Sequence, residues 1–176
     1  MAQRETLTEL QNRLAARLQA AQTEGPSVHW LAVEAGGGRY LVPLNQAGEI
    51  FPWTTVQSTP YTKPWFLGVA NLRGALCGVV DLGHFLAIDG LGVRSPSTLA
   101  ECKLLSFNAA LQINCALAVD RLAGLRGADA FALSAPALQD APAYFGRIYT
   151  DAAGLPWQEI QLQALAQTTS FLAIDA

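Results

Sequence analysis

The sequence predicts a mainly β domain, because short apolar runs alternate with turn signals at intervals of about 8–12 residues. The first two runs, Val28–Glu34 and Arg39–Leu44, flank the glycine triplet Gly36–Gly38, which is typical of a hairpin. Single glycines inside apolar runs, such as Gly68 and Gly78, fit the tight bends of a small barrel. These observations together predict a β-sandwich or β-barrel body.

The N-terminal segment has a different periodicity. Over residues 6–22, leucines recur at steps of three and four, which predicts one amphipathic helix. Gly25–Ser27 then ends the helix and acts as a linker. The helix either packs on the body of the domain or docks on another protein. We therefore divide the chain into a helix with linker over residues 1–27 and a β domain over residues 28–176.

Further strands follow the first hairpin, and each begins or ends at a turn signal. Asn108–Ala110 joins the second hairpin, and Ala123–Leu125 is expected to extend it. Pro156 is expected to confine the last strand to an edge of its sheet, because proline cannot donate a hydrogen bond. The expected strands are Ala47–Phe51, Trp65–Ala70, Ala75–Val80, Cys102–Phe107, Leu111–Val119, Tyr144–Tyr149 and Leu155–Ile160.

Short helices and loops separate the strands. Asp81 is well placed to cap a helical turn over Leu82–Leu86. Gly90–Ser97 is expected to be a loop, because glycine, serine and proline dominate it. Near the end of the chain we expect a short helix over Gln161–Gln167, followed by an apolar tail over Ser170–Ile174.

Composition excludes several classes of function. Apolar residues make up 51% of the 176 residues and charged residues 14%, which allows a sizeable core and leaves a surface that favours partner contacts. The net charge is −3 and lysine and arginine do not cluster, so nucleic acid is not an expected partner. No apolar run approaches the roughly 18 residues of a membrane span. The N-terminal residues also lack the order of a signal peptide, so we expect a cytoplasmic protein without direct membrane insertion.

Candidate catalytic and metal-binding residues are few. The three cysteines, Cys77, Cys102 and Cys115, form no CxxC pair and are expected to be free thiols. Asp81 and His84 would make an acid–base pair or two metal ligands, but no third ligand lies near them in the sequence. The serines lack the setting of an activated nucleophile. No cofactor is expected, and a hydrolase using His84 and Asp81 is kept only as a competing hypothesis.

Two charged residues lie in otherwise apolar surroundings. Arg73 lies in the polar island Asn71–Gly74 between two predicted strands, and Glu49 interrupts the strand Ala47–Phe51. An arginine between core strands is costly unless it has a partner or faces a surface. A Glu49–Arg73 pair across neighbouring strands would satisfy both groups. Such a pair either stabilises the fold alone or orients a surface for a partner.

The stretch Lys63–Leu86 carries a recognisable pattern. It contains a proline in the lead-in, then Gly68–Gly74 (GVANLRG), and then an apolar strand that closes on Val79–Leu82 (VVDL). This pattern resembles the signature of CheW-like domains, the scaffold proteins of bacterial chemosensory arrays. Flanking residues fit as well, because Ala47–Ile50 (AGEI) and Ala118–Asp120 (AVD) resemble other strand motifs of the family. The resemblance extends over most of the chain, from about Val28 to Ile174.

The lead-in Lys63–Trp65 is most similar to the PilI-type subgroup, which serves type IV pilus (twitching motility) systems. The resemblance implies two intertwined five-stranded β-barrels with a groove between them, and no enzymatic activity. It also implies two partners: the tip of a chemoreceptor's cytoplasmic hairpin, and the regulatory domain of a CheA-type histidine kinase. A protein with these partners would be recruited to membrane-associated receptor arrays. The alternative outputs, meaning the processes that such an adaptor would control, are flagellar chemotaxis and a diguanylate cyclase pathway.

The resemblance also implies a receptor-binding groove. The family's paired arginine and glutamate correspond to Arg73 and Glu49, which the composition had already marked as unusual. Two departures from the family pattern are notable: Gly78 replaces a usual proline, and Ala47 replaces a larger aliphatic residue, which would make the groove shallower. The residues expected at this groove are Glu49, Arg73, Ala47, Ile50, Asn71, Leu72 and Gly74.

Overall fold

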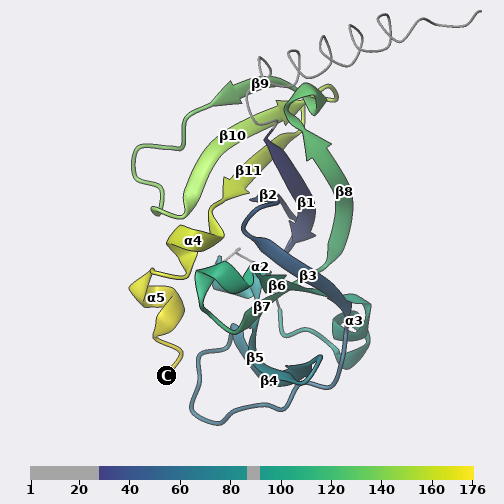
Figure 1. Cartoon of the computed structure of the whole chain (residues 1–176), viewed down its shortest axis with the longest axis vertical. Helices are drawn as coiled ribbons and strands as arrows, with labels where there is room; N and C mark the ends of the chain where they lie inside the picture. The colour runs from purple at the N-terminus through teal and green to yellow at the C-terminus, as the bar shows by residue number, and fades with distance from the viewer. Residues whose placement is uncertain (1–27, 87–91) are drawn as a thin grey trace, which may run out of the picture.

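Two β-sheets, drawn one above the other in Figure 1, make up most of the molecule. The structure is a computed structural model, and it describes residues 28–86 and 92–176. The helix expected over residues 6–22 and the linker Gly25–Ser27 lie outside the described residues. Part of the expected loop Gly90–Ser97 lies outside them as well.

The first sheet has six strands in the order β8-β1-β2-β11-β10-β9. Its neighbouring strands are antiparallel except β2 and β11, which run parallel where Gln158 and Glu159 pair with Tyr40 and Leu41. The strands are β1 (His29–Ala35), β2 (Gly38–Pro43), β8 (Arg121–Gly127), β9 (Phe131–Ala135), β10 (Phe145–Asp151) and β11 (Pro156–Ile160).

The second sheet has five strands in the order β3-β6-β7-β5-β4, with β5 and β7 parallel. All five strands follow β2 and precede β8 in the chain, so the second lobe is inserted into the first. The two lobes are therefore intertwined, and the mainly β fold predicted from the sequence is confirmed. The strands are β3 (Ala47–Pro52), β4 (Phe66–Leu72), β5 (Ala75–Asp81), β6 (Lys103–Phe107) and β7 (Cys115–Val119).

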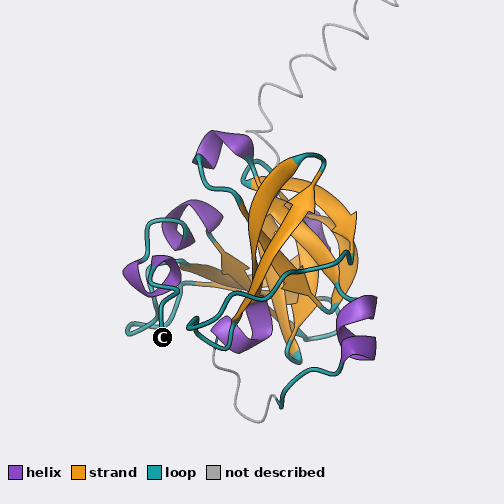
Figure 2. Ribbon diagram, turned by 90° about the horizontal axis from the view of Figure 1, so that it is seen from below, coloured by secondary structure: helices purple, strands orange, loops and turns teal. Residues whose placement is uncertain are grey.

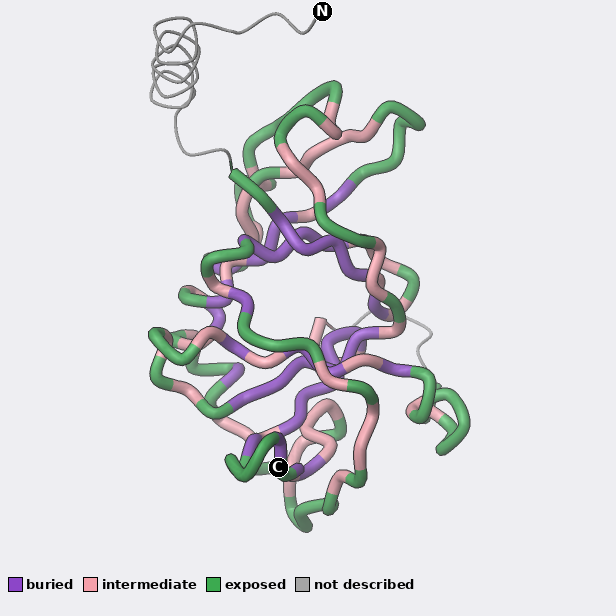
Figure 3. Tube along the Cα trace, turned by 45° about the vertical axis from the view of Figure 1, so that its right-hand side comes forward, coloured by how far each residue is buried: buried purple, intermediate pink, exposed green. Residues whose placement is uncertain are grey.

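Strand β1 shows how alternation along the chain contributes to two of the three hydrophobic clusters of the described residues. Its residues Leu31 and Val33 enter the largest core cluster, which also contains buried residues of the second sheet. Trp30 and Ala32 point to the opposite face and enter a smaller cluster with Leu41 and Trp157. Successive side chains of a strand point to opposite faces, so β1 is buried on both sides. A third cluster lies within the second sheet, and the buried segments accordingly run through the middle of the trace in Figure 3.

Short helices surround the sheets, as the view from below shows (Figure 2). The Asp81 carboxylate accepts a hydrogen bond from the backbone nitrogen of His84, which confirms the cap predicted for this helix. The predicted helix near Gln161 is also present. The helical segments are α2 (Leu82–Phe85), α3 (Pro96–Glu101), α4 (Leu162–Leu165), α5 (Thr169–Leu172) and the 3-10 turns η1 (Ala109–Leu111) and η2 (Ala128–Ala130).

The two glycines that suggested bends differ in their surroundings. Gly68 has φ +133° at an irregularity of β4, and a Cβ there would lie 2.0 Å from the backbone oxygen of Gln57. Only glycine fits this position, so the predicted tight bend is confirmed at Gly68. Gly78 instead pairs regularly with Val69 and Cys115, and a Cβ there would lie 3.0 Å from the Phe66 ring and 3.9 Å from the Asn114 backbone oxygen. The expectation of a bend at Gly78 is wrong.

Strand pairing differs from the prediction at two places. Ala123–Leu125 does not extend the second hairpin, because β8 crosses to the first sheet and pairs with β1. Strand β11 is not an edge strand, because it lies between β2 and β10. Pro156 is tolerated as the first residue of β11, beyond the two residues that pair with β2.

Several segment boundaries also differ from the prediction. Residues 109–111 form η1, so β7 begins only at Cys115 instead of Leu111. Strand β9 and helix α3 were not predicted, and β9 gives the first sheet six strands where the resemblance implied five. The apolar tail forms helix α5, because burying Phe171 against Trp65 and Phe85 holds it on the body. In the part of the chain that the structure describes, no helix combines the length and the apolar character needed to cross a membrane.

Candidate functional site

A two-residue turn positions Arg73. Strands β4 and β5 pair up to Leu72 and Ala75, so Arg73 and Gly74 alone connect them. Both have positive φ, +50° and +83°, which is the requirement of a type I′ hairpin turn. The Asn71 side-chain oxygen accepts a hydrogen bond of 2.7 Å from the Gly74 nitrogen and fixes the turn. A left-handed conformation costs a residue other than glycine or asparagine about 1 kcal/mol, so Arg73 is retained there at an energetic cost.

The Arg73 side chain forms the predicted pair with Glu49. One guanidinium nitrogen lies 2.9 Å from the carboxylate, and the two side chains are 76% and 53% exposed. The guanidinium carbon lies 5.9 Å from the centre of the Phe51 ring. Such an exposed pair contributes at most about 1 kcal/mol to stability. The pair therefore does more to define the shape and charge of the surface than to hold the fold together.

The pair spans the second sheet from one edge to the other. Glu49 lies on β3 and Arg73 follows β4, and these are the two outermost strands. The expectation of a pair across neighbouring strands is therefore wrong. The Glu49 nitrogen also donates a 2.8 Å hydrogen bond to the hydroxyl of Ser106 on β6, which fixes its backbone. The ion pair thus connects the two edges of the curved sheet at one end.

A groove of about 310 Å³ lies beside this ion pair. The strands, turns and loops of the second sheet alone line it, whereas the resemblance implied a groove between the two lobes. Its lining comprises Glu49, Phe51, Leu72, Arg73, Ala75, Cys77, Ser106, Phe107, Ala109, Ile113, Asn114 and Cys115.

Seven residues were predicted for a receptor-binding groove. Three of them line this groove: Glu49, Leu72 and Arg73. Asn71 and Gly74 belong to the turn that positions Arg73. Ile50 points away from Glu49 along β3 and is 45% exposed, and Ala47 is buried in the largest core. The structure thus gathers the charged pair and Leu72 and separates Ala47 from them.

The apolar part of the groove was not predicted from the sequence. Phe51 was detectable, because it is two residues from Glu49 and so lies on the same face of β3. Cys77 and Cys115 come from strands adjacent in the sheet but distant in sequence.

Burial raises the pKa of the Cys77 and Cys115 thiols, that of Cys115 to about 12, so they are protonated at neutral pH. All three cysteines are free and buried, which confirms the prediction of free thiols.

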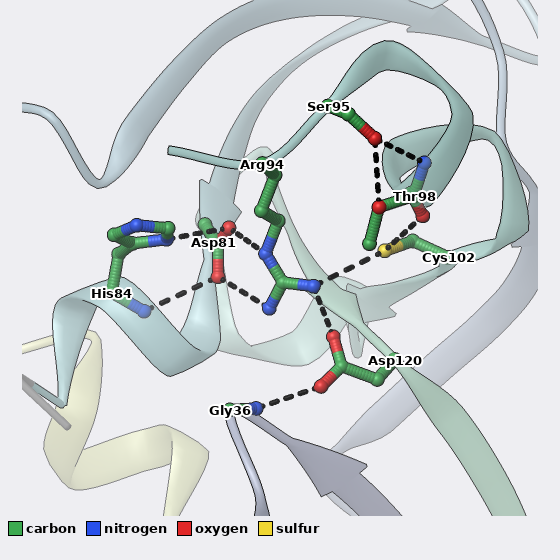
Figure 4. Close-up of polar contacts among 8 residues, drawn as sticks. All are labelled: Gly36, Asp81, His84, Arg94, Ser95, Thr98, Cys102 and Asp120. Atoms are coloured by element: carbon green, nitrogen blue, oxygen red, sulfur yellow. Dashed lines mark hydrogen bonds and ion pairs between the residues drawn. The ribbon is translucent and has the colours of Figure 1, made fainter. Parts of the chain in front are cut away.

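The Asp81–His84 pair belongs to a larger buried network (Figure 4). The His84 ring nitrogen Nδ1 lies 2.9 Å from Asp81, and Arg94 Nε lies 2.5 Å from the same carboxylate oxygen. Another nitrogen of Arg94 donates to the second Asp81 oxygen at 3.2 Å. Arg94 also pairs with Asp120. Both oxygens of Asp81 are therefore occupied, which leaves neither free to act as a general base.

Arg94 connects three parts of the fold. Asp81 ends β5 in the second sheet, Asp120 lies at the crossover from β7 to β8, and Asp120 also accepts a 2.8 Å hydrogen bond from Gly36 in the β1–β2 turn. Burial lowers the pKa of Arg94, but its hydrogen bonds with Asp120 and Asp81 outweigh this and raise the pKa above its ordinary value. Asp120 thus connects Arg94 to the β1–β2 turn of the first sheet. Across residues 28–86 and 92–176, no group of three or more potential ligands could hold a metal ion.

Comparison with known proteins decides the family. Residues 29–170 match the model of the CheW-like domain. The chain belongs to the CheW-like domain family. This confirms the assignment made from Gly68–Gly74 and the motifs around it.

Two curated relatives and one solved structure are similar to this CheW-like protein. Protein PilI of Pseudomonas aeruginosa is 30% identical over 166 residues, which cover 92% of this chain and 88% of that protein. A probable chemotaxis protein CheW of Rhizobium etli is 33% identical over 58 residues, covering 33% of this chain and 37% of its own. The crystal structure of the scaffolding protein TtCheW of Thermoanaerobacter tengcongensis superposes with a TM-score of 0.61 at 17% identity, over 76% of this chain and 88% of the other. The likeness to PilI-type members extends over nearly the whole chain, and the likeness to TtCheW shows the shared fold.

Proposed function

We propose that this CheW-like protein is a non-enzymatic adaptor that couples chemoreceptors to a CheA-type histidine kinase. Membership of the CheW-like family supports the adaptor role. Similarity to Protein PilI over 92% of the chain supports an array that controls type IV pilus twitching motility. An adaptor of this kind acts in the cytoplasm and is recruited to membrane-associated receptor arrays.

The groove closed by Glu49 and Arg73 is the proposed receptor site. The guanidinium and the carboxylate stand exposed at its rim, and Phe51 and Leu72 supply apolar surface beside them. The tip of a receptor's helical hairpin offers both polar and apolar side chains to such a surface. Asn71 and Gly74 act by holding the turn, while Ala47 and Ile50 lie on β3 before and after Glu49.

The kinase regulatory domain is proposed to dock on a separate surface, at an exposed strand edge of the lobes. Each contact is weak alone, but tethering in an array raises the effective concentration of every partner. A signal then requires only a small change in how receptor and kinase pack against the adaptor.

The observation that carries this proposal is the conformation of Arg73. A hairpin turn of this type favours asparagine or glycine at the first position, yet an arginine with φ +50° occupies it. Its exposed ion pair returns little stability. Backbone strain retained without a gain in stability indicates a functional constraint on the side chain.

The similarity to a second curated relative favours a different biological output for the adaptor. The similarity to a probable chemotaxis protein CheW covers 33% of this chain and favours flagellar chemotaxis. A diguanylate cyclase pathway is a further alternative output for the same adaptor chemistry. Deleting the gene separates the three outputs, because each alters a different phenotype: twitching, swimming or cyclic dinucleotide level.

The adaptor role is tested by co-purification of the protein with a receptor hairpin fragment and a kinase regulatory domain. We expect Arg73→Glu to lose the receptor fragment and to keep the kinase domain. Arg73→Gly should behave in the same way, and it keeps the left-handed turn, so loss of folding does not explain its result. The matched control is Arg147→Glu, an exposed arginine on β10 of the other sheet. Retention of both partners by both Arg73 variants would contradict the proposal.

A further inference from the structure

A second concave surface lies in the first sheet, away from the Glu49–Arg73 groove. Its volume is about 520 Å³. Leu122, Ala123 and Leu155 contribute apolar side chains, Gly124 contributes backbone, and the buried Trp157, which belongs to the core cluster within this sheet, also lines the surface. The charged lining residues are Glu34, Arg39, Arg121, Arg126 and Asp151. We call this surface the arginine cleft.

Three arginines face two carboxylates in the arginine cleft, although the chain as a whole carries a net charge of −3. Arg121 is already paired, because it donates two hydrogen bonds of 3.0 and 2.9 Å to Glu34. The Asp151 carboxylate is also hydrogen-bonded, since it accepts from the Trp157 indole nitrogen at 3.0 Å and from two backbone nitrogens of its own turn. The two carboxylates therefore have little capacity left for the other arginines.

Arg39 and Arg126 remain available. The Arg126 side chain donates only a long 3.5 Å hydrogen bond to the Ala123 carbonyl and lies over the Trp157 ring, 5.8 Å from its centre. The Arg39 side chain makes no hydrogen bond and no ion pair with any residue of the described part of the chain, and only its charge acts on Glu34 at a distance. Guanidinium groups pair with carboxylates and phosphates in a two-pronged geometry. The cleft is therefore complementary to negative charge at two separate points.

The spacing of these two points indicates the shape of the ligand. Arg39 pairs with Glu34 and Arg126 pairs with Trp30, so the two arginines are four residues apart along β1 and lie on strands on either side of it. With about 3.3 Å per residue and about 4.8 Å between strands, their Cα atoms are roughly 16 Å apart. An extended peptide spans this distance in four or five residues.

We propose that the arginine cleft binds an extended acidic segment of a partner protein, with two carboxylates four or five residues apart and an apolar side chain between them. The carboxylates pair with Arg39 and Arg126, and the apolar side chain packs on Leu155 and Trp157. A nucleic acid fits less well, because Glu34 and Asp151 would repel its phosphates and the basic charge is confined to two points. This site does not depend on the proposed receptor groove, because it lies on the other sheet.

The test is a selection of short random peptides on the wild-type protein, with counter-selection on the variant Arg39→Gln/Arg126→Gln. Both substitutions remove charge and preserve most of the side-chain volume. We expect enriched peptides with paired acidic residues around an apolar one. Measured by fluorescence anisotropy, they should bind the double variant at least about tenfold more weakly than the wild type, and binding should weaken as salt is raised. Arg147→Gln, which removes an exposed arginine outside the cleft, should bind them as the wild type does.

Three results would overturn the proposal: enrichment of peptides without acidic residues, equal binding to the double variant, or equal loss in Arg147→Gln. Displacement of the selected peptides by an oligonucleotide at lower concentration than by a glutamate-rich peptide would also contradict it, since it would assign the cleft to phosphate. If the double variant unfolds at the same temperature as the wild type, its loss of binding does not come from a loss of folding. The outcome leaves the receptor proposal untouched, because Arg73 is intact throughout.

Discussion

Replacing Arg94 by methionine is expected to destabilise the protein strongly. The Arg94 side chain is 9% exposed and its partner Asp81 is 1% exposed, so the substitution leaves the buried Asp81 carboxylate without its arginine partner and with only His84 bound to it. Breaking a buried ion pair by removing one partner costs about 3–5 kcal/mol. The second partner, Asp120, is 35% exposed and can be solvated, so it adds little to this cost. A total near 3–4 kcal/mol would be a large part of the roughly 5–15 kcal/mol that stabilises a domain.

Urea denaturation followed by tryptophan fluorescence measures this loss. The midpoint should fall while the slope stays unchanged, because the same surface is exposed on unfolding. Arg121→Met is the matched control: its partner Glu34 lies at the surface, so its midpoint should shift much less. Adding Asp81→Asn to Arg94→Met should recover part of the loss, because no charge is then stranded. A midpoint for Arg94→Met close to that of the wild type, or no recovery in the double variant, would refute the role assigned to Arg94.

Three other predictions follow from the packing. Gly68→Ala should destabilise the protein by more than about 2 kcal/mol, because its Cβ would lie 2.0 Å from the Gln57 oxygen, whereas Gly78→Ala should shift the urea midpoint much less. Phe171→Ala should cost about 3–5 kcal/mol by leaving a cavity against Trp65, and an unchanged midpoint would contradict the docking of α5. Burial holds the pKa of Cys115 near 12 against an ordinary value of 9.0; the native thiol should therefore resist alkylation at pH 8 until urea unfolds the chain, and stability should fall as pH rises from about 9 to about 12. Rapid labelling of native Cys115 would show that it is not buried.

The local features of the fold could be predicted from the sequence because they depend on short-range patterns. Two strands were predicted on either side of the polar island Asn71–Gly74, and Asp81 predicted the start of α2. Both features need only neighbours in the chain. The pair between Glu49 and Arg73 was predictable too, because two isolated charges in apolar surroundings need partners.

The missed elements depend on contacts between distant residues or on weak patterns. Strand β8 pairs with β1, whose paired residues lie 87 to 98 positions earlier in the chain, and no local pattern reports a crossover between sheets. Strand β9 is mostly exposed, so it lacks the alternation of a half-buried strand. Helix α3 did carry a signal, because Ser95 followed by Pro96 is a frequent helix start.

The side-chain network around Arg94 was not predicted either, because its members are distant from one another in the sequence. Asp81 was predicted as a helix cap and Asp120 was named only within the motif Ala118–Asp120, while Arg94 lies in a stretch whose glycine and serine content predicts a loop. Only the arrangement of the two sheets brings all three together. The apolar part of the groove was missed for a similar reason, because β5 and β7 pair in parallel through a long connection.

The most direct test of the proposed receptor site is an NMR titration of the isotopically labelled protein with a receptor hairpin fragment. Backbone amide shifts report where the fragment binds without any substitution. Binding in the groove predicts that the largest changes occur at Glu49, Phe51, Arg73 and Gly74, with little change at Arg39 and Arg126 of the other sheet. Changes that spare the Glu49–Arg73 groove and concentrate elsewhere would contradict the central claim that this groove receives the receptor.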